Sequence, residues 1–306
     1  MYNVEKLAKF HHVSQSKYLG PVKFRALFKR YGTEIDSIFS LTDKELLELP
    51  GISKQVLKGI REQENNFNKS KDFMEKQIEM ASKCGGGIVT IDDNSYPNVL
   101  KASSMCHPIL YYKGNLNEFI QYEKAIAIVG SRKASIKSQE IARKTALELA
   151  TKGWVIVSGL ALGIDSSAHI GALQANGLTI AILGCGPDII YPKDSKTIYE
   201  DISTKGVIIS EFPFGTKIED WKLRKRNKTT VAAAMGAFVV ETAEKGGAMN
   251  AVKACKEQKK KVFTVAQESD YQEHLSGNKN IIDNFGGIPV NTENAVSEIE
   301  KAILNG

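Results

Sequence analysis

Short apolar runs recur along the second half of the chain, and each is followed by a longer segment of mixed polar and apolar positions. Apart from Thr179 and Thr264 the runs are apolar and do not alternate with polar residues, which is typical of strands in a parallel sheet that is covered on both faces. They predict strands at residues 125–129, 154–157, 179–183, 207–209, 237–240 and 262–265. Helices are expected between them, at roughly 137–152, 165–176, 194–204, 228–235 and 248–259. This alternation predicts an α/β fold with a doubly wound, mostly parallel sheet.

The first 75 residues show helical periodicity and no convincing strand. One apolar helix face is formed at i, i+3, i+4 and i+7 by Phe24, Leu27, Phe28 and Tyr31. Further along, Thr42 and Glu45 have the spacing of a capping box. We therefore expect a small all-helical domain at the N-terminus.

The stretch LPGISKQVLKGI, residues 49–60, reads as a helix, a tight Pro-Gly turn and a second helix. It resembles a helix-hairpin-helix element, in which glycine lets backbone amides approach a DNA phosphate. The alternative is a helical turn that binds no ligand. A polar helix over residues 62–83 then leads to two strand-like segments at 87–91 and 109–112.

The domain organisation follows from this change of pattern. We expect a helical domain at residues 1–75, similar to a SAM or helix-hairpin-helix domain, and an extended Rossmann-like domain at residues 76–306.

Composition and charge exclude some classes of protein. The chain is 42% hydrophobic with a net charge of +6, and no apolar stretch approaches the ~20 residues that cross a bilayer. The N-terminus lacks the apolar core of a signal peptide, so we expect a cytoplasmic protein without membrane contact. The basic residues are concentrated in residues 1–30 and in residues 217–228, KIEDWKLRKRNK. Such clusters are compatible with an anionic partner.

The cysteines do not form a metal-binding or disulfide pattern. They are far apart, with no C-x-x-C pair, which predicts reduced, mostly buried thiols. They are Cys84, Cys106, Cys185 and Cys255.

The segments that follow the predicted strands carry the candidate chemistry, because ligands bind at the carboxyl ends of parallel strands. These segments contain glycines, hydroxyl groups and a few basic residues, and Arg132 follows the first strand. Glycine and helix N-termini allow close approach of a phosphate, and arginine can bind it with two donors. The complete dinucleotide fingerprint and the Gly-Lys-Ser/Thr ending of nucleotide-triphosphate loops are both absent. We therefore expect an anion site without a cofactor or a metal ion.

Seven segments in order resemble one family. They are IAIVGSRKAS, VSGLALGIDSSAH, TIAILGCGPDIIYP, IISEFPFGT, RKRNK, VVETAEKGGAMNAVKAC and VFTVA. Their order and spacing are similar to those of the DprA/Smf family of DNA-processing proteins, over about the last 210 residues strongly and the first 75 more loosely. The resemblance implies a Rossmann-like domain that binds single-stranded DNA, forms dimers and helps to load the recombinase RecA onto single strands in natural transformation. It implies no enzymatic activity.

The family motifs can be placed on this chain residue by residue. The Ser-Arg-x-x-Ser motif falls on Ser131, Arg132 and Ser135, and the Gly-Ile-Asp segment falls on residues 163–165, with His169 one helical turn further on. The remaining two motifs are Arg-Asn-Arg, on Arg226, Asn227 and Lys228, and the Ser-Gly-Ser-Leu turn, on Lys245, Gly246, Gly247 and Ala248.

Several positions depart from the family pattern. Lys228 keeps the charge of the second arginine but loses its planar fork. Arg224 adds a charge where the family has proline, and two serine hydroxyls are lost at Lys245 and Gly247. Residues 265–267, Val-Ala-Gln, replace Val-Pro-Gly, and either Asn278 or Asn280 takes the role of the family's asparagine near the end.

Each polar residue at a strand end also has a structural interpretation. Arg132 could form a salt bridge instead of binding phosphate, and we expect Asp165 to cap a helix that starts near Ser166. We expect His169 to be packed or hydrogen-bonded. For Glu211 and Glu241, the structural or loop-orienting role is preferred over a role in hydrolysis.

The basic stretch at 217–228 could be only a solvated loop. Trp221 favours a binding role, because single-strand binding combines cations for the phosphates with a ring on which a base stacks. Alternatively, Trp221 packs against the edge of the sheet and contacts no base.

The sequence thus predicts a dimeric single-stranded-DNA-binding protein that helps a RecA-type recombinase. The predicted nucleic-acid-binding residues are Gly130, Ser131, Arg132, Ser135, Gly159, Gly163, Lys217, Trp221, Arg224, Arg226, Asn227, Lys228, Gly246, Gly247 and Asn250.

The alternative is a nucleotide-binding enzyme. The stretch ETAEKGGAMNAV resembles the turn of lysine-decarboxylase-like phosphoribohydrolases, in which case Glu241 would assist N-glycosidic cleavage. A nucleotide or DNA sensor in phage defence is a variant of this alternative.

Overall fold

The structure, a computed structural model, describes residues 2–105, 107–266 and 275–305. Cys106 and Gln267 of the sequence predictions lie outside these residues. The chain divides into two compact units, residues 1–111 and 112–306. The expected boundary at residues 75 and 76 stays a prediction about independently folding domains.

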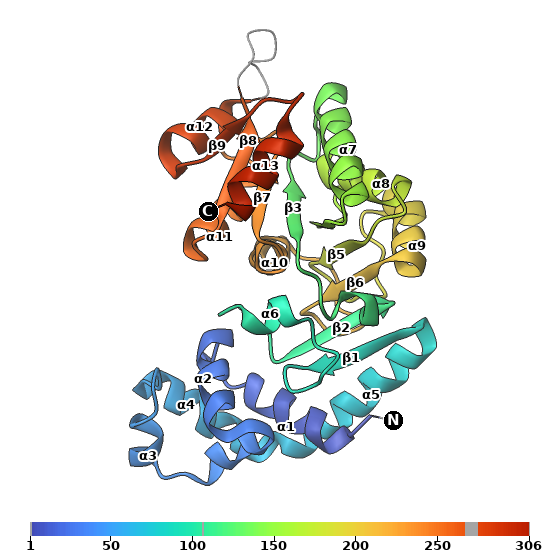
Figure 1. The fold of residues 1–306 in the computed structure, drawn as a ribbon. Helices are drawn as coiled ribbons and strands as arrows, with labels where there is room; N and C mark the ends of the chain where they lie inside the picture. The colour runs from blue at the N-terminus through green and yellow to red at the C-terminus, as the bar shows by residue number, and fades with distance from the viewer. Residues whose placement is uncertain (1, 106, 267–274, 306) are drawn as a thin grey trace. The chain divides into compact units, whose positions relative to one another are not determined.

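The N-terminal unit is helical up to Cys84, which confirms the all-helical expectation (Figure 1). The capping box is present, with the Thr42 amide donating to Glu45 at 2.8 Å and the Glu45 amide donating to Thr42 at 3.3 Å. On the predicted apolar face, Phe24 and Leu27 are 1% and 2% exposed. The helices are α1 Val4–Ser14, α2 Pro21–Tyr31, η1 Gly32–Ser40, α3 Asp43–Leu47, α4 Lys54–Gln63, η2 Glu64–Asn66 and α5 Phe67–Cys84.

Helix α5 ends where the sequence pattern changes from helix to strand. Its C-cap, Gly85, has a φ of +68°, a left-handed conformation that glycine adopts without steric cost. Strand β1 (Gly86–Thr90), helix α6 (Asn98–Ala102) and strand β2 (Ile109–Gly114) follow, and the two strands are neighbours.

The second unit is built on a parallel sheet with strand order β6-β5-β4-β3-β7-β8-β9. Each neighbouring pair in this order is parallel, which confirms the predicted sheet. The strands are β3 Ala125–Val129, β4 Val155–Ser158, β5 Thr179–Leu183, β6 Val207–Ser210, β7 Gly236–Val239, β8 Lys261–Val265 and β9 Ile288–Val290. Every residue of β3 to β7 is buried, as expected for a sheet covered on both faces.

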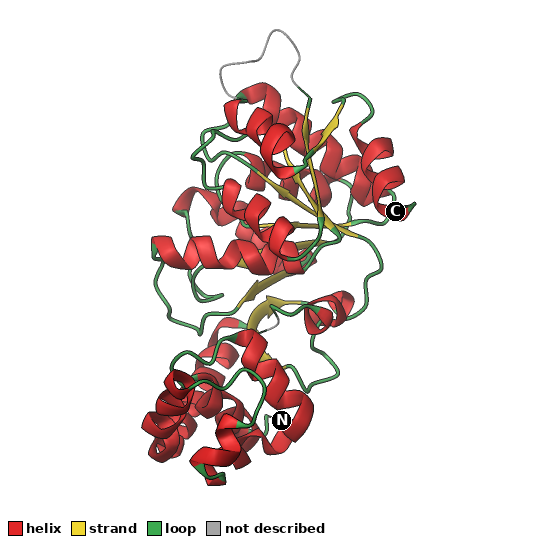
Figure 2. Cartoon of the chain, turned by 90° about the vertical axis from the view of Figure 1, so that its left-hand side faces the viewer, coloured by secondary structure: helices red, strands yellow, loops and turns green. Residues whose placement is uncertain are grey.

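Helices cover both faces of this sheet (Figures 1 and 2). The chain winds from β3 outward to β6, then returns to β7 and winds in the other direction to β9. The order reverses between β3 and β7, so the topological switch point, where such folds bind ligands, lies between these strands. The helices of this unit are η3 Leu116–Phe119, α7 Ile136–Thr151, α8 Ile164–Gln174, η4 Lys193–Ser195, α9 Lys196–Lys205, α10 Asp220–Ala232, α11 Met249–Glu257, α12 Ser276–Phe285 and α13 Ala295–Leu304.

The main apolar core forms between the sheet and the helices α7, α8 and α13. It contains Ile126 and Ile128 of β3, Leu149 of α7 and Ile299 of α13, all of them fully buried. Fully burying one such side chain contributes roughly 1.5–3 kcal/mol. This core holds the sheet rigid beneath the loops that follow its strands.

Two sequence expectations about the elements need correction. Helix α10 begins at Asp220, so most of the basic segment 217–228 is helical and not a loop. The pattern also missed α12, β9 and α13 at the end of the chain.

Two absences apply to the described residues alone. None of their helices combines the length and the apolar character needed to span a bilayer. No group of three or more potential metal-ligating side chains was found among them. Within them, Cys185 and Cys255 are buried thiols that form no disulfide, and Cys84 is partly buried.

Candidate nucleic-acid interface

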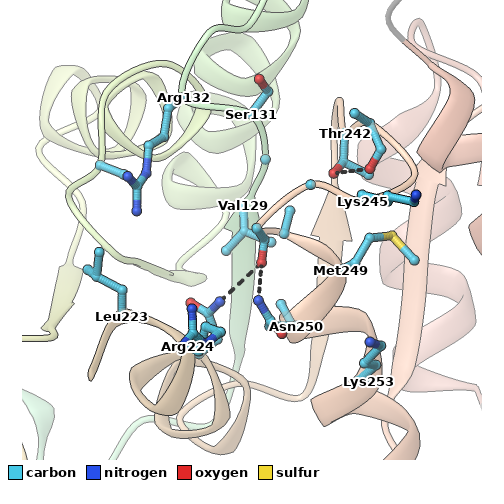
Figure 3. Close-up of a pocket in the computed structure, with 18 of the residues that line it drawn as sticks. Val129, Ser131, Arg132, Leu223, Arg224, Thr242, Lys245, Met249, Asn250 and Lys253 are labelled. Carbon is cyan, nitrogen blue, oxygen red and sulfur yellow. Dashed lines mark hydrogen bonds between the residues drawn. The ribbon is translucent and has the colours of Figure 1, made fainter. Parts of the chain in front are cut away.

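A groove of about 880 Å³ lies at the switch point of the sheet. Its walls come from the loop after β3, the loop after β7, and the helices α10 and α11 (Figure 3). It lies at the carboxyl edge of the parallel strands, where the sequence predicted the ligand site.

The groove is lined by more basic than acidic side chains. The basic ones are Arg132, Lys133, Arg224, Arg226, Lys245 and Lys253. The acidic ones are Asp165, Asp220 and Glu244. Figure 3 shows Arg132 and Arg224 on one side of the groove and Lys245 and Lys253 on the other. An extended polyanion would therefore meet cations on both walls.

Arg226 forms the buried base of the groove. Its side chain is 5% exposed, and its Nη1 lies 3.7 Å from Oδ2 of Asp165. The Nε and Nη1 atoms are enclosed and have no hydrogen-bond partner among the described residues. Burial lowers the pKa of Arg226, and the Asp165 carboxylate opposes that change. The guanidinium is thus held in place by one long ion pair and leaves donors unused.

Gly159 makes room for this arginine. A Cβ atom at position 159 would lie 1.1 Å from Nη1 of Arg226, so a larger residue would displace the guanidinium. A hydrogen bond fixes the backbone of Gly159, whose amide donates to Oδ2 of Asp165 at 3.1 Å. Glycine at this position therefore leaves the space that the guanidinium occupies.

Asp165 does not cap helix α8, contrary to the sequence expectation. The helix begins at Ile164, and its N-cap is Gly163, with a φ of +77°. Asp165 lies in the first turn and points to Gly159 and Arg226. Burial raises the pKa of its carboxyl group, while Arg226 and nearby backbone amides act in the opposite direction. Its role is to hold Arg226.

His169 is packed and hydrogen-bonded, as expected from the sequence. Its Nδ1 lies 2.7 Å from Oγ1 of Thr179, whose hydroxyl donates to the carbonyl oxygen of Ile156 at 2.8 Å. The single hydroxyl proton is used in that bond, so Nδ1 must carry the proton that it shares with Thr179. Burial, with a smaller contribution from Arg226, lowers the pKa of His169 to about 3, so the ring is neutral.

Glu241 joins the loops that follow β3 and β7. Its carboxylate accepts hydrogen bonds from the amide of Ser135 at 3.1 Å and from the hydroxyl of Ser135 at 2.8 Å. The carbonyl oxygen of Glu241 accepts the amide of Ser131 at 2.8 Å. These contacts confirm the loop-orienting role of Glu241. Ser135 also caps α7, because its Oγ accepts the amide of Ser138 at 3.1 Å.

Glu211 likewise has structural partners. It accepts from the hydroxyl of Thr229 at 3.0 Å and pairs with Lys225 at 2.6 Å. Both partners lie on α10, so Glu211 anchors this helix to the end of β6.

The asparagines of the groove brace the turn at Gly247. The side-chain amides of Asn227 and Asn250 both donate to the carbonyl oxygen of Gly247, at 3.4 and 3.0 Å (Figure 3). Of the two candidates near the end of the chain, Asn278 is buried and bonds the backbone at Val240 and Thr242, whereas Asn280 lines the groove. Asn278 therefore fixes the loop after β7.

Trp221 lies on α10 beside the groove and does not line it. The residue is 49% exposed, and its Nε1 donates to Glu219 at 2.7 Å. Its ring meets the ring of Phe212 edge to face at 5.9 Å. Part of the indole is thus packed, and a substantial part is accessible to a base.

The structure brings together nine of the predicted site residues around the groove. They are Gly130, Ser131, Arg132, Arg224, Arg226, Asn227, Gly246, Gly247 and Asn250. Six predicted residues do not line it: Ser135, Gly159, Gly163, Lys217, Trp221 and Lys228. Among these, Lys228 pairs with Glu257 at 2.8 Å, and Lys217 is exposed.

Sequence reasoning missed three cations of the groove as site residues: Lys133, Lys245 and Lys253. Lys133 directly follows Arg132, and Lys253 lies on α11 one turn after Asn250. The spacing of Asn250 and Lys253 on one helix face could have indicated the latter.

The fold and the groove define a doubly wound α/β protein with a basic ligand site at the switch point. The family model for DNA recombination-mediator protein A matches residues 87–300, and the chain belongs to this family. This confirms the resemblance drawn from the seven sequence segments.

Individual relatives agree with this assignment. The chain is 33% identical over 273 residues to the protein Smf of Synechocystis, and the match covers 89% of this chain and 67% of that protein. It spans 61% of the DNA processing protein DprA of Bacillus subtilis, at 31% identity. The structure of DprA from Streptococcus pneumoniae superimposes with a TM-score of 0.71 at 25% identity, over 95% of this chain and 97% of that one. DprA from Helicobacter pylori, whose structure concerns its binding mode for single-stranded DNA, shares the fold with a TM-score of 0.63 at 24% identity, over 71% of this chain and 97% of that one.

Proposed function

We propose that the chain binds single-stranded DNA in the groove at the switch point, as a mediator of DNA recombination. The observation that carries this proposal is the placement of six basic side chains around one groove, on both of its walls. Such a groove follows a phosphate backbone without reading its sequence, which is the general mode of single-strand binding.

The individual contacts have different strengths. Arg132 and Arg224 are exposed and can bind phosphate oxygens through two parallel hydrogen bonds. Lys245 and Lys253 supply point charges on the opposite wall. Arg226 is buried and adds positive charge at the base of the groove.

Trp221 extends this surface beyond the groove. It lies three residues before Arg224 on the same helix, so a strand held by Arg224 has its neighbouring base within reach of the indole. A duplex keeps its bases stacked inside and cannot use this ring. This arrangement supports a preference for single strands.

The wider role rests on the family. A homodimer, a RecA-type recombinase as partner and a function in natural transformation are part of the proposal, as is the absence of catalysis. The alternative hydrolase would need Glu241 to face a nucleotide, and its carboxylate is instead bonded to Ser135 outside the groove lining.

The test is a titration of labelled oligo-dT with the full chain at several salt concentrations. We expect tight binding that weakens with salt and that is much weaker for a duplex of equal length. Equal affinity for the two forms, or the release of free base from nucleoside monophosphates, would contradict the proposal.

A further inference from the structure

The N-terminal unit contains the same turn twice. The first turn, residues 16–19, joins α1 to α2, and the second, residues 49–52, joins α3 to α4. In each turn the amide of the fourth residue donates to the carbonyl oxygen of the first: Leu19 to Ser16 at 3.2 Å, and Ile52 to Leu49 at 3.1 Å. The Pro-Gly hairpin seen in the sequence is therefore one half of a repeated element.

The backbone conformation repeats as well. The third residue of each turn has a positive φ, +65° at Tyr18 and +81° at Gly51. The fourth residue is buried, with Leu19 5% and Ile52 6% exposed, and the N-cap of the next helix follows directly. The two turns have dissimilar sequences, SKYL and LPGI, so this duplication is visible only in the structure.

The two turns belong to one surface. A Cβ atom at Gly51 in the second turn would lie 3.4 Å from Cγ of Lys23, which follows the first turn. A Cβ atom at Gly59 on α4 would lie 2.3 Å from the carbonyl oxygen of Lys17, so helix α4 packs closely against the first turn. We call residues 15–23 and 49–58 the twin-turn surface.

The two turns and the helices that follow them are rich in basic residues. Residues 15–31 contain five basic side chains and no acidic one, and residues 49–61 contain three and none. Lys17, Lys54 and Lys58 are exposed. An exposed acid, Glu48, directly precedes the second turn. Another acid, Glu62, pairs with Lys17 at 2.8 Å across side chains that are 69% and 41% exposed. Exposed pairs of this kind contribute at most about 1 kcal/mol, so a phosphate can replace the carboxylate.

We propose that the twin-turn surface is a second nucleic-acid site, which binds double-stranded DNA through its two phosphate backbones without reading the sequence. The two backbones of a duplex are related by a local twofold axis, so each of two equivalent turns could contact one backbone. DNA-binding proteins often match the symmetry of the DNA in this manner. The lysines displace counterions from the phosphates. A protein partner would need an apolar centre, and the exposed apolar side chains of this surface are Tyr18 and Val22 alone.

The proposed duplex site shares no residue with the groove, so the experiment measures duplex binding and single-strand binding separately. The full chain is titrated with a short labelled duplex of mixed sequence and, separately, with oligo-dT, over a range of salt concentrations. The variant is Lys54→Gln with Lys58→Gln. Its matched control is Lys71→Gln with Lys76→Gln on α5, which makes the same charge change on exposed lysines of the same unit.

We expect the Lys54/Lys58 variant to bind the duplex at least tenfold more weakly at low salt, and its salt slope to fall by roughly 1.8, or about 0.9 per lost contact. Its affinity for oligo-dT stays within twofold of the wild type, which also shows that the chain is folded. The control keeps its duplex affinity.

Three outcomes overturn the proposal. They are no duplex binding by the wild type at low salt, equal weakening in the control, and loss of duplex binding in Arg132→Ala, which would place the duplex in the groove. A failure of oligo-dT binding in the wild type concerns the groove alone and leaves this site standing.

Discussion

The guanidinium of Arg226 occupies the space in which any side chain at position 159 would stand. A Cβ atom there would lie 1.1 Å from Nη1 and 2.1 Å from Cζ of the arginine. Gly159→Ala must therefore push Arg226 out of its pairing with Asp165. We expect a loss of unfolding free energy of roughly 1–3 kcal/mol from overpacking, together with weaker binding of oligo-dT.

Denaturant unfolding and an oligo-dT titration measure the two effects of this substitution. Gly20→Ala serves as the control, because its added Cβ meets nothing within 4 Å and the residue does not line the groove. A Gly159→Ala protein with unchanged stability would show that Arg226 moves freely, and the packing argument would be wrong.

Arg132 tests the phosphate contact in the groove. Arg132→Ala should weaken binding to all single-stranded sequences alike and reduce the salt slope by roughly 0.7, the value for one contact with a single strand. Lys205→Ala, an exposed cation at the end of α9, should leave the slope unchanged. Identical slopes for wild type and Arg132→Ala, with normal folding, would remove Arg132 from the site.

Trp221 and Glu241 distinguish the binding protein from the hydrolase. Trp221→Ala removes a half-exposed ring and should cost roughly 1–3 kcal/mol of binding free energy, or about 5- to 150-fold in affinity. Glu241→Gln should change the affinity little, since it alters one anchor of the loop at Ser135.

The measurements are oligo-dT affinity and the release of base from nucleoside monophosphates. The hydrolase predicts the opposite ranking, because losing general acid-base assistance typically costs ~100- to 10,000-fold in rate. Turnover that disappears in Glu241→Gln, with normal DNA affinity in Trp221→Ala, would favour the enzyme.

His169 gives the folded chain a pH dependence in acid. Its pKa is lowered to about 3 in the folded state by burial, whereas an unfolded histidine titrates near 6.5. The unfolded chain therefore binds the extra proton first, and the free energy of unfolding falls as the pH drops below about 6.5. At pH 5 this residue should account for roughly 2 kcal/mol of lost stability.

The variant His169→Gln isolates this contribution, because a neutral amide can still donate to Thr179. Denaturant unfolding at pH 7 and pH 5 should show a smaller loss in the variant than in the wild type, by about that amount. Parallel loss in both proteins would mean that His169 is protonated with its ordinary pKa in the folded chain.

The sequence by itself determined the architecture of the second unit. Residues 125–129 are apolar at every position and residues 179–183 at all but Thr179, and the structure has strands with these bounds. A strand buried on both faces needs no polar positions, and the short length and β-branched residues of these runs favour a strand over a buried helix. The glycines and Arg132 that follow the strands also indicated the edge of the sheet at which the groove lies, because the carboxyl ends of parallel strands meet there.

The tertiary structure alone decided what the basic segment does. Helix α10 buries Lys222, Arg226, Thr229 and Thr230, so its inner face is polar and gives no apolar periodicity to read. Arg226 can be buried only because Gly159 leaves space and Asp165 supplies a counter-charge, and both lie far away in the sequence. Lys228 likewise pairs with Glu257, a residue distant in the sequence, and does not line the groove. The first turn of the N-terminal unit could not be recognised from its sequence, because its backbone conformation repeats that of the Pro-Gly turn and its residues do not. A local sequence pattern shows which residues are apolar. Which residues neutralise a buried charge, and which turns share a backbone conformation, depends on contacts between segments that are distant in the sequence.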